Sequence, residues 1–239
     1  MPISVNSSAP ALVSDNGEIT SVTTASFTRP AAGSLLVAIT GATSETAPTV
    51  SGGGLTWTRR VQRTGSDCFA EIWTAPVTGS GSMTVTLGNL TAVGDFLPAA
   101  VGAIKVVSVA GQHPTNPIGT TGSGTSSANT LNVTAYNATT AGSRGFFSAV
   151  DAIGTGVPTS SDTGFGYYED FAFGATAGMC AYKAADSGAP GAAVTINADA
   201  AGSESAGWLW AALEIVPEPS SRITAAVVSR AAVYRAANW

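Results

Sequence analysis

Charged residues are scarce in this sequence of 239 residues. Asp, Glu, Lys and Arg together make up 10% of the chain, and the formal net charge is −5. The basic face that binds nucleic acid electrostatically is therefore missing. No apolar run approaches the roughly 20 residues that a membrane-spanning helix needs. We therefore expect neither nucleic acid nor a membrane among the partners. The low charge also excludes a polyelectrolyte-like disordered chain, and 44% of the residues are apolar.

Residues with catalytic or metal-binding chemistry are equally few. His113 is the only histidine, so a Ser-His-Asp or Cys-His arrangement would depend on this one loop residue. Cys68 and Cys180 with one histidine do not supply the three or four ligands of a zinc site. We expect two buried free thiols; a disulfide is the less favoured alternative, because nothing indicates an oxidising compartment. The N-terminal residues lack the basic and apolar regions of a signal peptide.

Carboxylates offer the remaining route to catalysis, as the acid/base pair of a glycosidase. Glu71 lies on a predicted strand beside Trp73, and Glu169 and Asp170 follow two tyrosines. Neighbouring residues on a strand point to opposite faces, so Glu169 and Asp170 are not expected to converge. The glycine run 52–54 lacks the lysine and the helix of a phosphate-binding loop. The sequence therefore predicts no catalytic residue, no metal site, no cofactor and no enzymatic activity.

Short segments with a β pattern fill the chain instead. Met83, Val85 and Leu87 alternate with threonines, which is the period of a half-buried strand. The apolar run 35–39 is typical of a strand buried on both faces. About twelve strand candidates precede residue 217, and no segment there predicts a helix. The candidates are 19–28, 35–39, 57–63, 68–74, 83–87, 103–109, 131–136, 145–153, 164–173, 179–185, 194–198 and 208–216.

The order of these segments repeats. The loop and aromatic strand at 48–57 recur at 158–167, which aligns Leu55 with Phe165 and Trp57 with Tyr167. The other matches are Ala32-Gly33-Ser34 with Ala141-Gly142-Ser143, Val85 with Ile196, and Ala103-Ile104-Lys105-Val106 with Ala212-Leu213-Glu214-Ile215. We therefore predict an all-β fold, a β-sandwich of jelly-roll type built from two similar halves of about six strands, with a C-terminal extension. The sequence leaves open whether the halves form one sandwich or two.

Composition divides the chain into five parts. They are an N-terminal arm or edge strand (1–18), a first β half (19–110), a Gly/Ser/Pro-rich linker loop (111–129), a second β half (130–216) and a C-terminal docking extension (217–239). The extension has a net charge of +2, whereas the rest of the chain has −7. This contrast favours an arm that docks on a neighbouring subunit, and packing on its own domain is the alternative.

The extension also has an amphipathic pattern. As a helix, it would place Ile223, Val227, Ala231 and Tyr234 on one face, whereas an isolated helix of this length is marginal without a partner surface. Whether the extension is a helix or an added strand stays open. The candidates for subunit docking are Arg222, Arg230, Tyr234, Arg235 and Trp239.

Tryptophan gives a second set of candidates. In the strand at 208–215, alternation places Leu209, Ala211, Leu213 and Ile215 on one face, and Trp208, Trp210 and Glu214 on the other. The tryptophan face is either buried between sheets or open to a partner or a sugar ring. The candidates for glycan or partner stacking are Trp57, Trp73, Trp208 and Trp210.

A short basic strand follows Trp57. Its alternation predicts that Arg59, Val61 and Arg63 share a face with Trp57 and that Arg60 points to the opposite one. This strand is either a contact for an acidic partner or a solvated sheet edge, where charges suppress edge-to-edge pairing.

Several segments contain recognisable turn and strand-core strings, such as Arg29-Pro30-Ala31-Ala32-Gly33-Ser34 and Leu55-Thr56-Trp57; these segments are 27–37, 54–60, 70–76, 141–146, 181–186, 208–217 and 229–239. They resemble parts of tailed-phage structural proteins, especially those of actinobacterial phages. The resemblance covers most of the chain, and its motifs are turns and strand cores. It implies a virion component, on the tail or on the head surface, and it carries over no catalytic residues.

From the resemblance and the lack of reactive residues we expect a non-enzymatic bacteriophage virion structural protein. It would be a minor tail protein or, second, a capsid decoration protein. Its partners would be capsid or tail subunits, in a homo-oligomer or in many copies, and it would be made in the host cytoplasm and located in the virion. The alternative is a carbohydrate-binding or adhesin module that recognises a host surface glycan. A glycan hydrolase that uses Glu71 ranks last.

Overall fold

The computed structural model describes residues 2–6, 10–17, 19–65, 67–93, 100–127, 130–151, 165–173, 176–199 and 207–219. Within these ranges the chain forms strands that pair antiparallel and contains no helix, so the all-β prediction is confirmed. The strands of the first half are β1 (Ser4–Asn6), β2 (Val13–Gly17), β3 (Ser21–Thr23), β4 (Phe27–Thr28), β5 (Leu35–Thr43), β6 (Thr49–Gly52), β7 (Thr58–Gly65), β8 (Cys68–Pro76), β9 (Ser82–Met83), β10 (Val85–Gly88) and β11 (Ala100–Ala110). Those of the second half are β12 (Ile118–Ser126), β13 (Thr130–Asn137), β14 (Arg144–Asp151), β15 (Phe165–Phe173), β16 (Thr176–Lys183), β17 (Ala193–Asp199) and β18 (Trp208–Ile215).

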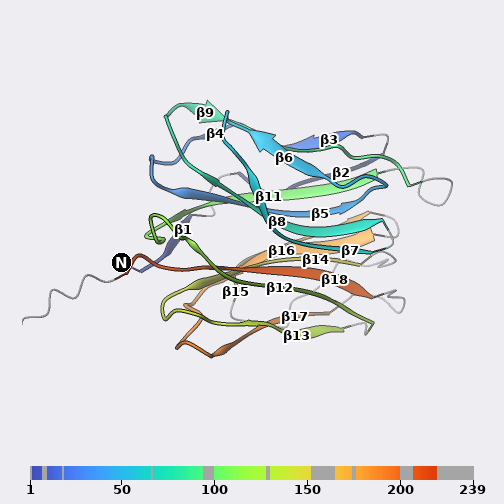
Figure 1. Cartoon of the computed structure of the whole chain (residues 1–239). Coiled ribbons are helices and arrows are strands. Elements are labelled where there is room, and N and C mark those ends of the chain that lie inside the picture. Colours follow the sequence, from blue (N-terminus) through green and yellow to red (C-terminus); the bar gives the residue numbers. More distant parts are fainter. Residues whose placement is uncertain are drawn as a thin grey trace, which may run out of the picture.

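The strands form four stacked layers (Figure 1). The first half has a large sheet in the order β1-β11-β5-β8-β7, with β2 also paired to β11, and a small sheet in the order β3-β10-β6. The second half has a large sheet in the order β12-β18-β14-β16-β15 and a small sheet of β13 and β17. The two large sheets form the middle layers and face each other, whereas the small sheets lie outside.

Each half is therefore a β-sandwich, and the two sandwiches have the same strand order. Strands β11, β5, β8 and β7 take the places of β18, β14, β16 and β15. The turns before β5 and β14 also agree, since Gly33 and Gly142 have φ values of 89° and 80°. The next residues, Ser34 and Ser143, each donate a backbone hydrogen bond back across the turn. The prediction of two similar halves is confirmed. Jelly-roll connectivity stays a prediction.

A second shared feature is found in one edge strand of each large sheet. Strand β7 has a β-bulge after Arg59, and β15 has one after Phe165. Arg59 pairs with Trp73, and its guanidinium carbon lies 5.4 Å from the Trp73 ring centroid. Phe165 pairs with Lys183, whose Nζ lies 4.6 Å from the Phe165 ring centroid. The two halves therefore keep one cation–π pair beside the bulge, with cation and aromatic ring exchanged between the strands. The sequence alignment of Phe165 with Leu55 stays a prediction.

The sequence alignment of Lys105 with Glu214 was wrong, because the two residues do not share a face. Lys105 lies on β11 on the same side as Val107, which packs toward the second half, and its Nζ donates a hydrogen bond to the Pro10 carbonyl (2.8 Å). Glu214 lies on β18 on the same side as Ala212, which packs inside the second sandwich. The two residues thus point to opposite sides of their sheets. The register of β11 and β18 follows strand pairing, which the sequence match did not detect.

The contact between the two large sheets is an apolar core of its own. Strand β5 packs on β14, β8 on β18, β11 on β16 and β2 on β15, so the order of one sheet runs opposite to that of the other. Strands β5 and β14 take the same place in their sheets and pack on each other, while the strands beside them pack in exchanged order. This is the arrangement of a symmetric dimer with a two-fold axis, here formed by the two halves of one chain. The chain is therefore two packed sandwiches, which answers the question that the sequence left open. The buried residues include Val37, Ile39, Ile72, Val107 and Val109 from the first half and Phe146, Tyr182, Leu213 and Ile215 from the second.

The segment predicted as the linker loop 111–129 is a strand for half of its length. Strand β12 pairs with β18 and forms the edge of the second large sheet, which leaves 111–117 as the connection between the sandwiches. Its Gly, Ser and Thr composition predicted a loop because it lacks apolar alternation. The structure gives the reason for this composition. A Cβ on Gly122 would lie 1.8 Å from the carbonyl oxygen of Ala135, so the strand passes too close to β13 for a side chain.

Gly122→Ala is therefore expected to destabilise the chain by about 1–3 kcal/mol, because β12 must shift away from β13 to accept the methyl group. Urea unfolding followed by intrinsic fluorescence measures the change as a lower midpoint at an unchanged slope. Gly88→Ala on β10 is the matched control, since its Cβ would find its nearest atom at 3.7 Å. Equal midpoints for Gly122→Ala and the wild type would contradict the close packing of β12 on β13.

Candidate functional site

The tryptophans do not form a stacking surface. Trp208 and Trp210 lie in the core of the second sandwich, and Trp73 lies in the core of the first. The predicted alternation of β18 is confirmed, but both of its faces are covered because β18 lies in a middle layer. The prediction that Trp73, Trp208 and Trp210 stack on a sugar ring is therefore wrong. Of the four described tryptophans only Trp57 is partly exposed, and its Nε1 donates a hydrogen bond to the Gly52 carbonyl (3.2 Å).

The basic strand β7 also differs from its prediction. The bulge after Arg59 breaks the alternation, so Arg59 and Val61 lie on opposite faces rather than on the same one. As a result Arg59 and Gln62 both donate hydrogen bonds to Oε1 of Glu71, at 3.1 and 2.5 Å. Arg60 donates to the hydroxyl of Thr74 at 2.7 Å. The arginines of β7 are thus partly engaged inside the first half.

Glu71 is the centre of this cluster and is fully buried. Its second oxygen, Oε2, accepts a hydrogen bond from Nε1 of Trp73 at 2.8 Å. Burial raises the pKa of Glu71 above its ordinary value, and the hydrogen bonds from Trp73, Arg59 and Gln62 oppose this shift. A buried carboxyl with a raised pKa is chemically suited to proton transfer. The side chain points into the core of the sandwich, however, and the described grooves do not include it.

A second buried carboxylate, which the sequence did not single out, holds the second sandwich together. Glu214 on β18 accepts four hydrogen bonds from the neighbouring segments. Its Oε1 accepts from the Thr139 amide (2.8 Å) and the Ser143 hydroxyl (2.6 Å). Its Oε2 accepts from the Thr120 amide (3.0 Å) and the Thr139 hydroxyl (2.7 Å). Burial alone raises the pKa of Glu214, but these bonds outweigh it and hold the pKa below its ordinary value.

The two glutamates are therefore structural. Each carboxylate is bound by groups of its own sandwich, and neither side chain is exposed. The other predicted carboxylates, Glu169 and Asp170, lie on β15, where the side chains after Phe165 fall outside the described residues. Within the described ranges no group of three or more His, Cys, Asp or Glu residues is arranged to hold a metal ion.

The cysteines lie at the contact between the sandwiches. Both are buried and neither forms a disulfide, so the prediction of two free thiols is confirmed. Burial raises the pKa of the Cys68 thiol, whose sulfur lies 3.3 Å from the Thr43 hydroxyl. Thr43 also contacts the hydroxyl of Thr176 in the second half at 3.1 Å. In the part of the chain that the structure describes, no helix is long and apolar enough to cross a bilayer.

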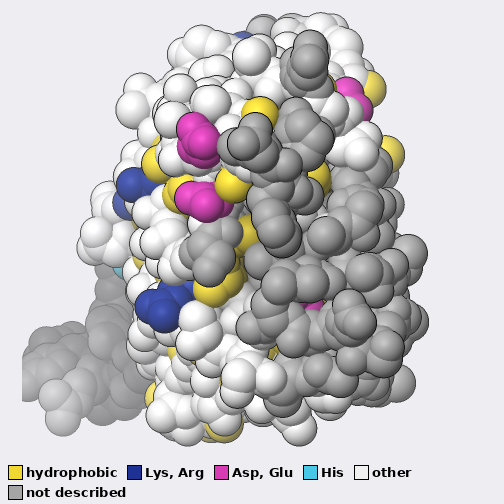
Figure 2. Space-filling model, turned by 90° about the vertical axis from the view of Figure 1, so that its right-hand side faces the viewer, with side chains coloured by type: hydrophobic (Ala, Val, Ile, Leu, Met, Phe, Trp, Pro, Cys, Tyr) yellow, Lys and Arg dark blue, Asp and Glu magenta, His cyan; other side chains and the backbone are white. Residues whose placement is uncertain are grey.

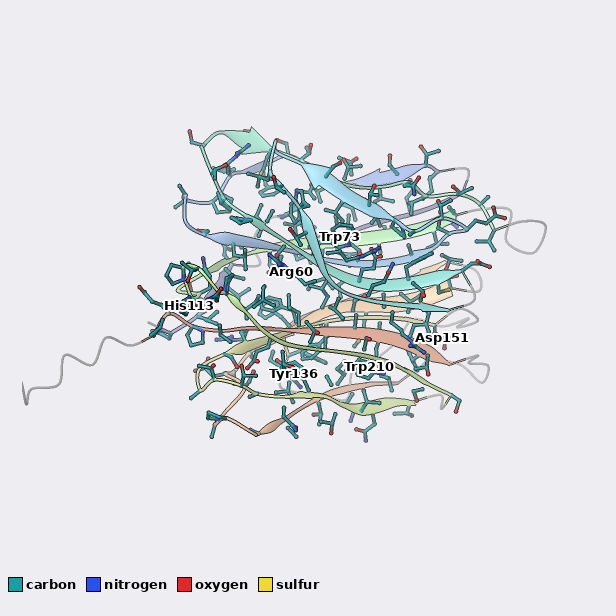
Figure 3. All side chains as sticks on the ribbon, in the orientation of Figure 1. Arg60, Trp73, His113, Tyr136, Asp151 and Trp210 are labelled. Carbon is teal, nitrogen blue, oxygen red and sulfur yellow. The ribbon has the colours of Figure 1, made fainter. Side chains whose placement is uncertain are left out.

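A groove of about 610 Å³ lies at one end of the four layers and is the larger of the two described grooves. His113 lies at this end, and Asp151 and Trp210 lie toward the opposite one (Figure 3). The groove is lined by Pro2, His113, Thr140, Ala141, Gly142, Asp186, Val216, Pro217, Glu218 and Pro219. Its walls are thus mainly apolar, with one histidine and two carboxylates.

Both ends of the described chain meet at this groove. The Glu218 amide donates to the Gly111 carbonyl (2.8 Å), and the His113 amide donates to the Val216 carbonyl (2.9 Å). Gly111 also lies against the N-terminal segment, since its Cβ would be 2.5 Å from the Pro2 carbonyl oxygen. The stem of the C-terminal extension is therefore held on the connection between the sandwiches. The predicted docking residues Arg222, Arg230, Tyr234, Arg235 and Trp239 lie outside the described residues.

The groove wall is fixed by two polar clusters. Nδ1 of His113 accepts hydrogen bonds from the amides of Thr115 (3.3 Å) and Asn116 (3.1 Å), which sets the ring orientation. The guanidinium of Arg144 forms an ion pair with Asp186 at 3.2 Å and donates to the Ile3 carbonyl at 3.3 Å. This arginine thereby ties the N-terminal segment to the second sandwich. This contact could not be predicted from the sequence, because the three residues are far apart along the chain.

Comparison with known proteins returns no match for this chain, whether to family models, to curated proteins or to solved structures.

Proposed function

We propose that this chain is a non-enzymatic structural protein of a bacteriophage virion, attached to the particle by one end. The observation that carries the proposal is the convergence of Pro2 and Pro217–Pro219 on one groove at one end of the body. Chain segments at the same end allow docking there while the rest of the body projects away. The type of particle, a phage virion, is proposed from the resemblance to tailed-phage structural proteins. On the same ground a minor tail position is preferred over head decoration.

The construction of the body agrees with a passive structural role. Its buried carboxylates are engaged inside the sandwiches, and its middle sheets are covered on both faces. Charged side chains are sparse among the described residues on the end that lies away from the groove (Figure 2). Thr, Ser and Gly supply much of the remaining surface. Such a surface is suited to subunit contacts made by backbone and apolar groups, and it exposes few long, flexible side chains.

Cryo-electron microscopy of purified virions tests the proposal directly. We expect density for the four-layer body on the particle, with the His113 end toward it and the opposite end outward. A chain truncated after Pro219 is expected to fold and to be absent from the particle, because it lacks the predicted docking residues. Circular dichroism of the truncated chain serves as the control for folding.

Two outcomes would contradict the proposal. A wild-type chain that is missing from purified virions would remove the structural role. Wild-type levels of the truncated chain on the particle would show that the extension does not attach it. Location at the tail tip together with quenching of Trp57 fluorescence by a cell-wall glycan would instead support the adhesin alternative, which now depends on this one partly exposed tryptophan.

A further inference from the structure

We infer that the groove beside His113 is the acceptor for the C-terminal segment 220–239 of a second copy of this chain. The inference rests on the proposed function, because it names the contact through which copies associate on the particle. The occupant is one segment of known sequence. It follows directly from Pro219, the last described residue, which itself lines the groove.

Charge favours this pairing. The segment 220–239 contains three arginines and no acidic residue, which gives it a net charge of +3 and leaves −8 on residues 1–219 from the total of −5. The groove presents the carboxylates of Asp186 and Glu218, and the Asp186 side chain remains 46% exposed beside Arg144. A basic segment is therefore attracted to the body and, within the groove, to its acidic wall.

The apolar part of the groove matches the apolar part of the segment. Five of the residues that line the groove are apolar, namely Pro2, Ala141, Val216, Pro217 and Pro219. Between its arginines the segment carries Ile223, Val227 and Tyr234, at spacings that share one face of a helix. Recognition of an amphipathic segment by an apolar groove with a charged rim is a common mode of peptide binding.

The stem of the extension explains why the occupant is a second copy. The stem forms one wall of the groove, and the Glu218 amide is bonded to the Gly111 carbonyl. Pro217 and Pro219 fix their own φ angles and keep Glu218 out of the helical region, so the stem is extended and stiff. Because the stem borders the groove as an extended wall, we expect the segment that follows it in the same chain to continue along that wall. A segment from another copy can lie across the groove without a turn at Pro219.

Disulfide trapping in the full-length chain tests the inference. One version carries Ala141→Cys in the groove, and a second carries Ser229→Cys between the arginines of the segment. The native cysteines are buried and do not compete. When the two versions are mixed and oxidised, we expect a cross-linked heterodimer as the main product. A version with Ser21→Cys, which is exposed on the outer small sheet, replaces Ala141→Cys as the control and is expected to give little product.

Charge variants test the recognition itself. Neutralising the groove with Asp186→Asn and Glu218→Gln is expected to lower the yield of heterodimer about 2- to 10-fold, as for the loss of two exposed ion pairs. Glu45→Gln, an exposed acidic residue away from the groove, is the matched control and is expected to change nothing. The yield is also expected to fall as the salt concentration rises.

The results that differ from these expectations distinguish failure of the groove contact from failure of the proposed function. If the double variant Ala141→Cys/Ser229→Cys closes within one chain at high dilution and the mixture gives no heterodimer, the segment binds its own groove and the inference fails. Absence of both products also overturns it. If heterodimers form but the chain is missing from virions, the groove contact stands and the proposed function fails. If the chain is on virions without any cross-link, the proposed function stands and the groove contact fails.

Discussion

Glu214→Gln, which conserves the size of the side chain, is expected to destabilise the chain by about 3 kcal/mol at pH 7. Each carboxylate oxygen of Glu214 accepts one fixed backbone amide, from Thr139 on Oε1 and from Thr120 on Oε2. The NH₂ group of glutamine must replace one oxygen, and it then opposes a backbone N–H in either orientation. One buried donor thus loses a charge-assisted bond and remains unsatisfied. Urea unfolding measures the loss.

Glu71→Gln is the matched control, because Glu71 is equally buried and its partners are side chains. Its partners Arg59 and Gln62 can rotate toward solvent or toward the amide oxygen. The substitution also removes the cost of keeping a buried carboxylate ionised. We therefore expect a change of no more than about 1 kcal/mol. Equal losses for the two variants would contradict the distinction between fixed and adaptable donors.

The two glutamates also give opposite pH dependences. The folded pKa of Glu214 is lowered, so its contribution is complete above the unfolded pKa of about 4.3 and is lost as the pH falls through the folded pKa. The folded pKa of Glu71 is raised, so the fold loses stability as the pH rises from the unfolded pKa through the folded one. The difference between the wild type and Glu214→Gln is therefore expected to shrink in acid. A difference that grows in acid would refute the role of the ionised carboxylate.

The sequence could predict the features that depend on local pattern. The alternation in β18, the glycine turns at Gly33 and Gly142 and the duplicated order of strands all follow from backbone preferences, which leave regular signals along the chain. The two buried free thiols were predicted on a different ground, the lack of any sign of an oxidising compartment. These features fix the fold class and the two halves without knowledge of any distant contact.

The remaining features depend on contacts between distant segments. Trp208 and Trp210 are buried because a small sheet covers them, and no pattern in β18 itself distinguishes a covered face from an open one. The bulge after Arg59 reverses the alternation of β7, although nothing in its composition marks the extra residue. Strand β12 has no apolar residue after Ile118, and at Gly122 it passes too close to β13 for a side chain. The groove was not predictable, since Pro2, Asp186 and Pro217 meet only in the fold.

The other large effect is expected at the contact between the sandwiches, where Phe146→Ala should lower the free energy of unfolding by about 3–5 kcal/mol. Phe146 lies on β14 and points toward the first half, with its ring centroid 5.9 Å from that of Tyr182. The adjacent Phe147 points into the second sandwich and packs against Tyr136 and Phe165. Both phenylalanines are fully buried, so the two alanine variants remove the same side chain from opposite faces of one strand.

Hydrogen exchange distinguishes the two variants even where their total losses are equal. Because β14 packs on β5 and β8, the cavity left by Phe146→Ala is expected to weaken protection of the β5 and β8 amides in the first half. Phe147→Ala should confine the loss of protection to the second half, chiefly to β13 and β17, which cover that face. Unchanged protection of β5 and β8 in Phe146→Ala would mean that the sandwiches unfold independently. The apolar contact would then join two autonomous units and would not form a core common to both.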